Sequence, residues 1–172
     1  MAKIVKDKYD INPKTQKFIL QMCWAQHDSQ WYLKTKRKYG VDVANQLNQE
    51  VILSMGKIEA RHILSALGIK KGSVNSSQEF VKIINTIMDV IIPKIMKFNL
   101  IVDSDKEVTC YVDKCFTWEQ VKKAGGEKTF KCSCSARQKG WTDAMGINPK
   151  IIHSKSIPEG DEICEFKVFL ED

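Results

Sequence analysis

Helix start and stop signals at the beginning of the chain constrain its fold more than any other feature. Asn12 precedes Pro13, which combines a favoured N-cap residue with a proline at the first helical position. Gly40 follows a basic turn, as is typical of a helix end. Asp42 is the predicted cap of a second helix that ends at Gly68. The chain is therefore predicted to begin with two long antiparallel helices joined by a tight turn.

A third helix is predicted after Ser76, because Glu79 follows three residues later and completes a capping box. Its apolar residues surround most of the helix, which suits burial inside the domain; they are Phe80, Val81, Ile84, Ile87, Met88 and Ile91. Pro93 should kink or restart this helix, because proline has no backbone N–H to donate.

The second half of the chain carries shorter elements. We expect strands at residues 100–102 and 107–112 and short helices at residues 118–124 and 135–145. Residues 150–157 and 162–169 are expected to form a terminal hairpin. Thr117 is the predicted cap of the first short helix, and Pro158–Asp161 has the composition of a hairpin turn. The predicted fold class is α+β, in which antiparallel helices of residues 12–99 pack on a small α/β part, residues 100–172, with a C-terminal antiparallel β-hairpin. One domain spanning residues 1–172 fits this length.

Charge and hydropathy argue against two classes of partner. The 27 Lys and Arg residues outnumber the 21 Asp and Glu residues but are scattered, which favours a solvated surface over a nucleic-acid groove. The apolar-rich stretch Phe80–Leu100 contains charged residues and a proline, so it is not a predicted membrane span. The first twelve residues lack the apolar core of a signal peptide, and the six cysteines then suggest reducing cytosol. We expect a cytoplasmic protein.

A cluster of aromatic and titratable residues lies in the first helix. Helical spacing predicts that Trp24, His27 and Trp31 share one face, with Asp28 and Tyr32 beside them. One interpretation is a pocket floor with indole walls, in which His27 is an acid, base or ligand. The other is a buried histidine that packs between tryptophans in the core, and the sequence does not separate the two.

Glu59 and His62 stand three residues apart in the second helix, a spacing that can place both side chains on one ion or ligand. Di-iron bundles need two such pairs and two further glutamates, whereas this chain has one pair. A shared metal site with His27 is disfavoured, because about 1.5 Å of rise per residue puts the two histidines roughly 13 Å apart along antiparallel helices.

The cysteines of the second half suggest either a structural metal or a reactive thiol. A zinc or iron ion held by four thiolates is one interpretation, with Cys115, Cys132, Cys134 and Cys164 as its ligands. A single reactive thiol, Cys132 or Cys134, near a helix N-terminus is the other. Cys164 lies in an alternating strand pattern and also fits a core position.

Five motifs, taken in order, carry a resemblance to a known group of proteins. They are His27–Tyr32 (HDSQWY), Gly40–Leu47 (GVDVANQL), Met55–Arg61 (MGKIEAR), Asn148–Ile151 (NPKI) and Gly160–Phe166 (GDEICEF). As a set they resemble prokaryotic cytosolic proteins similar to the L-2-amino-thiazoline-4-carboxylic acid hydrolases, and more distantly the vinyl-reductase-type ligand-binding domains. The resemblance extends from about residue 17 to residue 170.

The resemblance implies a helical layer packed on an α/β part, with a pocket between them. Positions that match the group's pattern are His27, Asp28, Trp31, Cys115, Cys132 and Cys164. Residues 154–161 read SKSIPEGD, where many members have Cys-x-x-Cys-Pro-Pro-Asp, so two metal-ligand candidates are absent. The hydrolase opens a thiazoline ring, but no catalytic set transfers to this chain residue by residue.

Two functional hypotheses follow. The first is a hydrolase acting on a C–N or C–S bond of a small molecule, with His27 as general base, Asp28 as its orienting partner and Cys132 or Cys134 as nucleophile. The second is a non-catalytic protein that binds a ligand, metal or cofactor in the same pocket. The ligand-binding candidates for both are Trp24, Trp31, Tyr32, Glu59 and His62. A small molecule is the expected partner, and a homodimer is left open.

Overall fold

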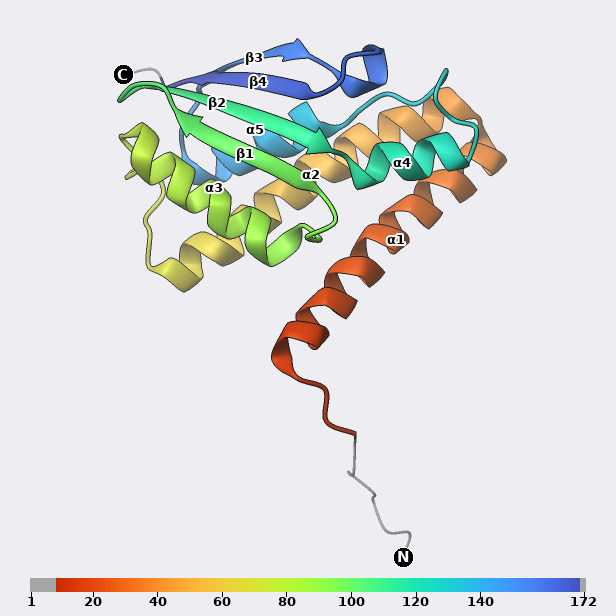
Figure 1. Ribbon diagram of the computed structural model, residues 1–172, viewed down its shortest axis with the longest axis horizontal. Helices are drawn as coiled ribbons and strands as arrows, with labels where there is room; N and C mark the ends of the chain where they lie inside the picture. Colours follow the sequence, from red (N-terminus) through yellow and green to blue (C-terminus); the bar gives the residue numbers. More distant parts are fainter. Residues whose placement is uncertain (1–8, 171–172) are drawn as a thin grey trace, which may run out of the picture.

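The computed structural model describes residues 9–170. Residues 1–8, where no signal peptide is expected, lie outside the described part. The helices are α1 (Pro13–Tyr39), α2 (Val41–Leu67), α3 (Ser77–Ile91), α4 (Phe116–Lys123) and α5 (Cys134–Met145), with a 3-10 turn at Ile157–Glu159. The strands are β1 (Lys97–Val102), β2 (Glu107–Lys114), β3 (Lys150–Lys155) and β4 (Cys164–Phe169). The predicted α+β class, with N-terminal helices and a C-terminal hairpin, is confirmed (Figure 1).

The helix boundaries follow from local caps, as the sequence predicts, with two corrections. The Asn12 side chain accepts a hydrogen bond from Thr15 N at 3.0 Å, and Gly68 adopts a left-handed conformation after α2. Asp42 is not a cap, because α2 already begins at Val41 and Asp42 falls in its first turn. Thr117 is not a cap either, since the Cys115 sulfur accepts from Trp118 N at 3.4 Å.

The third helix ends where proline would interrupt it. The Ser76 side chain accepts from Glu79 N at 3.3 Å, so this half of the predicted capping box is confirmed. The helix ends at Ile91, before Pro93, and β1 starts at Lys97. Pro93 therefore marks the end of the helix rather than a kink within it.

Four antiparallel strands form one sheet in the order β1-β2-β4-β3. The terminal hairpin, β3 with β4, is confirmed. Its strand β4 also pairs with β2, so this hairpin and the β1–β2 hairpin join edge to edge. Along β4, Cys164, Phe166 and Val168 are buried and alternate with less buried residues, which gives the sheet one core face. In Figure 1, α2, α3 and α5 lie together on one side of this sheet.

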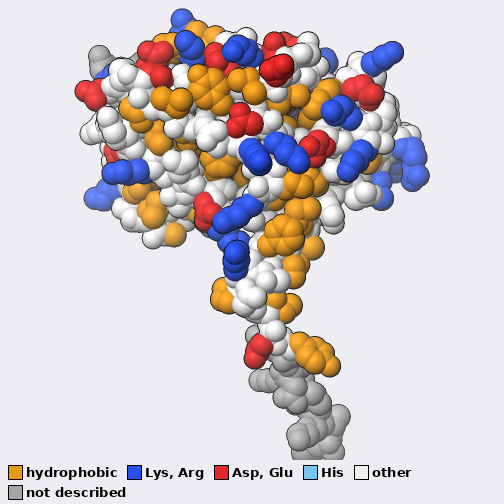
Figure 2. All heavy atoms as spheres, in the orientation of Figure 1, with side chains coloured by type: hydrophobic (Ala, Val, Ile, Leu, Met, Phe, Trp, Pro, Cys, Tyr) orange, Lys and Arg blue, Asp and Glu red, His pale blue; other side chains and the backbone are white. Residues whose placement is uncertain are grey.

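The hydrophobic core lies between those helices and the sheet. Its most enclosed residues include Ala60, Ile83, Ile87, Val108 and Met145. The N-terminal turns of α1 instead project from the body, and Phe18, Ile19 and Leu20 there are exposed (Figures 1 and 2). On the face drawn in Figure 2, Lys and Arg side chains are interspersed with Asp and Glu. None of the described helices is long and apolar enough to cross a bilayer.

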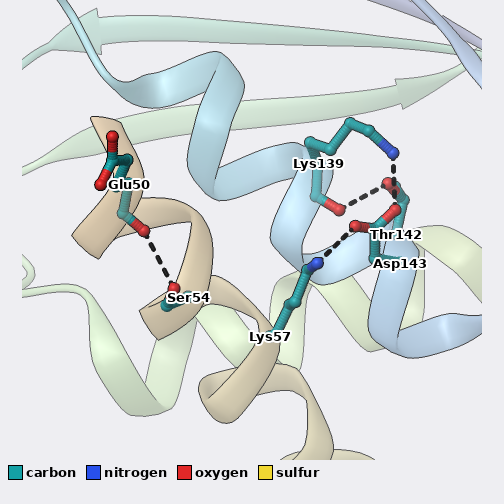
Figure 3. Close-up of polar contacts among 6 residues, drawn as sticks. All are labelled: Glu50, Ser54, Lys57, Lys139, Thr142 and Asp143. Atoms are coloured by element: carbon teal, nitrogen blue, oxygen red, sulfur yellow. Dashed lines mark hydrogen bonds and ion pairs between the residues drawn. The ribbon is translucent and has the colours of Figure 1, made fainter. Parts of the chain in front are cut away.

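Helices α2 and α5 cross at a backbone-to-backbone contact. A Cβ added at Gly56 would stand 2.5 Å from Arg137 O, and one added at Gly140 would collide with Leu53 O and lie 2.9 Å from Lys57 N. At the outer edge of the crossing, Asp143 pairs with Lys57 at 2.9 Å and with Lys139 at 2.6 Å (Figure 3). The crossing therefore requires glycine.

Replacing Gly140 with alanine should lower the free energy of unfolding by about 2 kcal/mol or more. Overpacking typically costs about 1–3 kcal/mol, and the roughly 1 kcal/mol by which alanine favours a helix offsets only part of a backbone collision. Chemical denaturation measures the change. Lys139→Ala is the control, since it introduces the same side chain at the neighbouring exposed position and should cost about 0.5 kcal/mol or less. Equal stability of the two variants would contradict the close-contact explanation.

Candidate functional site

A cavity of about 140 Å³ lies beneath α1, at the end of the sheet where β2 leads into α4. Aromatic side chains supply much of its wall, among them Trp24, Tyr32, Phe116, Trp118 and Phe130. A cavity of about 150 Å³ in another protein holds a benzene molecule. The space is therefore suited to a ring-sized small molecule. We name it the outer chamber.

Four cysteines from three parts of the chain line the outer chamber. Cys115 caps α4, Cys132 precedes α5, Cys134 is the first residue of α5, and Cys164 is the first residue of β4. Two of these sulfurs accept backbone hydrogen bonds, Cys115 from Trp118 N at 3.4 Å and Cys164 from Ile157 N at 3.3 Å. The fold thus brings Cys115 and Cys164 to the neighbouring pair Cys132 and Cys134.

Polar side chains of α2 hold the loop that carries Cys132. Asn45 bridges Thr129 and Lys131, because its Nδ2 donates to Thr129 O at 2.8 Å and its Oδ1 accepts from Lys131 N at 3.1 Å. Gln49 Nε2 donates to Cys132 O at 2.8 Å. Asn48, one turn after Asn45, bonds the Ser133 hydroxyl at 3.2 Å. These bonds fix the loop backbone against a helix, which positions the sulfur.

Cys132 differs electrostatically from the other three thiols of the chamber. The hydrogen bond from the Cys134 thiol, supported by the Cys134 backbone N–H, lowers the pKa of Cys132 to about 7 against the effect of burial. The same hydrogen bond and burial raise the pKa of Cys134. Burial raises the pKa of Cys115 to about 11 and also raises the pKa of Cys164. The hydrogen bond therefore favours the thiolate form at Cys132 and the thiol form at Cys134.

Asp28 brings a carboxyl group to the same chamber. Burial raises its pKa above the ordinary value, opposed by the nearby charges of Arg137 and His27. Arg137 also lines the chamber. Its Nε donates a hydrogen bond to Glu59 Oε2 at 3.1 Å, and its Nη2 donates to Glu59 Oε1 at 2.7 Å. Glu59 is 4% exposed and also accepts from Trp141 Nε1 at 2.9 Å. The chamber therefore combines a thiolate, a carboxyl group and an oriented guanidinium group.

The structure corrects the predicted face of α1. Trp24, Asp28 and Tyr32 line the chamber, whereas His27 and Trp31 do not. Trp24, Asp28 and Tyr32 are four residues apart and share one face of α1. His27 is three residues after Trp24, so it lies to one side, at the rim of the chamber, where its side chain is 68% exposed. Its ring stacks on Trp24 with centroids 5.9 Å apart, and its Nδ1 lies 3.9 Å from Asp28 Oδ1.

Glu59 and His62 do not meet at a ligand site. Glu59 is enclosed by Arg137 and Trp141, while His62 is exposed, and neither lines the outer chamber. The two side chains lie one turn apart on α2, and α5 packs over Glu59 but not over His62. Within residues 9–170, no three His, Cys, Asp or Glu side chains are grouped to hold a metal ion. The predicted four-cysteine zinc or iron site is thus not found among these residues.

Comparison with known proteins identifies the family. The sequence profile of the L-2-amino-thiazoline-4-carboxylic acid hydrolases matches residues 21–168. The chain belongs to this family. Curated proteins give no match. The fold is similar to that of a trafficking protein particle complex subunit 3 from Naegleria fowleri covalently bound to palmitic acid, at a TM-score of 0.57 and 16% identity. That alignment covers 92% of this chain and 97% of the other.

Several residues of this hydrolase-family chamber were not predicted from the sequence. Arg137, Trp118 and Phe130 line it, and Asn45 and Asn48 hold its loop. A signal for the asparagines exists, since both lie on the buried stripe of α2, where an amide needs a partner. Nothing in the sequence marks Arg137, whose partner Glu59 is 78 residues away.

Proposed function

We propose that this chain is a thiol-dependent hydrolase that cleaves a C–N or C–S bond of a small molecule in the outer chamber. One observation carries the proposal: of the four thiols that line this cavity, Cys132 alone has a lowered pKa, about 7. A thiolate is the nucleophilic form of cysteine, and a pKa near ambient pH suits nucleophilic attack. Membership of a hydrolase family supports the same reading.

The first step is attack by the Cys132 thiolate on the electrophilic carbon of the substrate. The Sγ–carbon bond forms, the C–N or C–S bond breaks, and the leaving atom takes a proton from Asp28. Water then attacks the same carbon and returns a proton to Asp28, while the Sγ–carbon bond breaks and regenerates the thiolate. The raised pKa of Asp28 suits a group that both gives and accepts a proton.

The other residues of the chamber would position the substrate. Two donor groups of Arg137 bind Glu59, which leaves the rest of its guanidinium group for a substrate carboxylate. Trp24 and Tyr32 would enclose the ring, and Tyr32 is itself fixed by a 2.9 Å hydrogen bond to Asn45. His27, whose Nδ1 lies 3.9 Å from Asp28 Oδ1 at the rim, would help to orient the Asp28 carboxyl group rather than act on the substrate.

A second candidate is a non-catalytic binding protein that uses the same chamber. The structurally similar trafficking subunit carries covalently bound palmitic acid, and the present chamber joins a nucleophilic thiol to an apolar wall. A bound zinc or iron ion would belong to this candidate too. Mass spectrometry of the intact purified chain and elemental analysis detect either one.

The proposed function is tested by incubating the purified chain with L-2-amino-thiazoline-4-carboxylic acid. Hydrolysis adds one water and gives a product with a free thiol or a free amine, according to which ring bond breaks. We expect repeated turnover, followed by mass spectrometry and a chromogenic thiol reagent. Stoichiometric binding without product, or a hydroxylamine-labile acyl group on Cys132, would instead support the binding protein.

A further inference from the structure

A second cavity lies behind the outer chamber, between α3, α5 and the core face of the sheet. It has a volume of about 90 Å³, and we name it the inner chamber. Six residues line both spaces, so the two cavities adjoin at these side chains: Ile92, Met96, Val112, Cys134, Arg137 and Phe166. Cys134 is the donor to Cys132, so this shared boundary begins one hydrogen bond away from the nucleophile.

The inner chamber is apolar except at one point. Phe80, Ile84 and Met88 of α3 and Phe98 of β1 contribute to its wall. Of its polar groups, Arg137 and Trp141 are bonded to Glu59, and the Thr142 hydroxyl is bonded to Lys139 O at 3.1 Å. Cys110 is a neutral thiol, because burial raises its pKa to about 12. The first three are hydrogen-bonded within the protein, and a neutral thiol is only a weak hydrogen-bond donor.

Gln138 is the exception. It lines the inner chamber, and its Oε1 is buried without a hydrogen-bond partner. Leaving a buried acceptor without a partner is unfavourable, so such groups are rare in folded proteins. Gln138 is on α5, four residues after Cys134, on the same side of the helix. An N–H or O–H of a bound molecule would supply the missing donor.

We propose that the inner chamber is the specificity pocket of the hydrolase site, receiving a short apolar side group of the substrate whose terminal hydroxyl or amine donates to Gln138. This inference rests on the proposed function and names its substrate class. By comparison with the cavity of about 150 Å³ that holds benzene, the side group has roughly four heavy atoms.

The test uses chloroacetamides, which alkylate a thiolate with loss of chloride and carry a variable N-substituent. N-butyl, N-(3-hydroxypropyl) and N-methyl chloroacetamide are compared by their second-order rate constants at Cys132, read by peptide mass spectrometry. In the native chain the N-butyl reagent should react at least about tenfold faster than the N-methyl reagent, because three more methylenes are buried. Equal rates would overturn the inference about the inner chamber. If the N-methyl reagent still alkylated Cys132 rapidly, the proposed role of Cys132 as nucleophile would stand.

Two variants locate the effect. Cys110→Leu fills the inner chamber alone, since Cys110 does not line the outer one, and should bring the butyl-to-methyl ratio close to one. Gln138→Leu should lower the hydroxypropyl-to-butyl ratio about tenfold, the effect of one lost hydrogen bond of about 1.4 kcal/mol. It should not lower the melting temperature, because it removes an unpaired buried acceptor. Ratios unchanged by both variants would contradict the inference.

A reversible probe covers the case in which Cys132 proves unreactive and the proposed function fails. Binding of 4,4,4-trifluorobutan-1-ol is followed by fluorine NMR on the native chain. Line broadening that Cys110→Leu abolishes would support the inner chamber as a pocket for a short alcohol. Identical spectra for the native chain and Cys110→Leu would overturn it.

Discussion

Cys132→Ala should reduce kcat/KM for thiazoline ring opening by at least about 10³-fold, because the variant has no sulfur to form the covalent intermediate. The loop should keep its position, since Gln49 bonds the Cys132 carbonyl oxygen and not its side chain. Turnover is measured by product mass, and thermal unfolding shows whether the variant is folded.

Cys115→Ala is the matched control for this loss. Cys115 lines the same chamber, but its pKa is raised to about 11, so it is protonated at neutral pH. Its replacement should change kcat/KM by about tenfold or less, through the loss of the sulfur that caps α4. If Cys132→Ala and Cys115→Ala were equally active, covalent catalysis at Cys132 would be contradicted.

Glu59→Ala should lower the free energy of unfolding by about 3–5 kcal/mol, the second of the two largest effects expected. The carboxylate of Glu59 accepts three hydrogen bonds, two from Arg137 and one from Trp141. Its removal leaves a largely buried guanidinium group and an indole N–H without partners, and an uncompensated buried charge is strongly destabilising. Urea unfolding measures the change.

Glu50→Ala on the same helix is the control, because Glu50 is exposed and should contribute about 0.5 kcal/mol or less. The double variant Glu59→Leu with Arg137→Met should recover part of the stability, because well-packed apolar residues can replace a buried ion pair, while the indole N–H of Trp141 stays without its acceptor. It should remain inactive if Arg137 holds the substrate carboxylate. A loss below about 1 kcal/mol for Glu59→Ala would show that the pair is not structurally important.

The helical half could be predicted from the sequence because its signals are local. Asn12, Gly40, Gly68 and Ser76 act within one helical turn, and each marks a helix boundary in the structure. The two cap errors have the same local origin. Asp42 and Thr117 are good cap residues, but Gly40 and Cys115 already occupy the N-cap positions two residues earlier.

The pairing of β2 with β4 could not be predicted in the same way, because their partners are more than fifty residues apart. The same limit applies to the site. Sequence reasoning named the cysteines and Asp28 but placed the chemistry on His27, whose one-residue displacement from Asp28 takes it to the rim. The role of Cys132 depends on a hydrogen bond from Cys134, two residues later at the start of α5, and on the backbone conformation that allows it, which spacing alone does not reveal.

The most direct test of the central claim is the pH dependence of Cys132 alkylation by iodoacetamide, with each cysteine peptide quantified separately. A thiolate whose pKa is lowered to about 7 is protonated below that pH and reactive above it. The Cys132 rate should therefore rise with a midpoint near pH 7, while the Cys115 rate stays low until the solution is strongly alkaline. A Cys132 midpoint at or above the ordinary thiol value of about 8.5 would contradict the account.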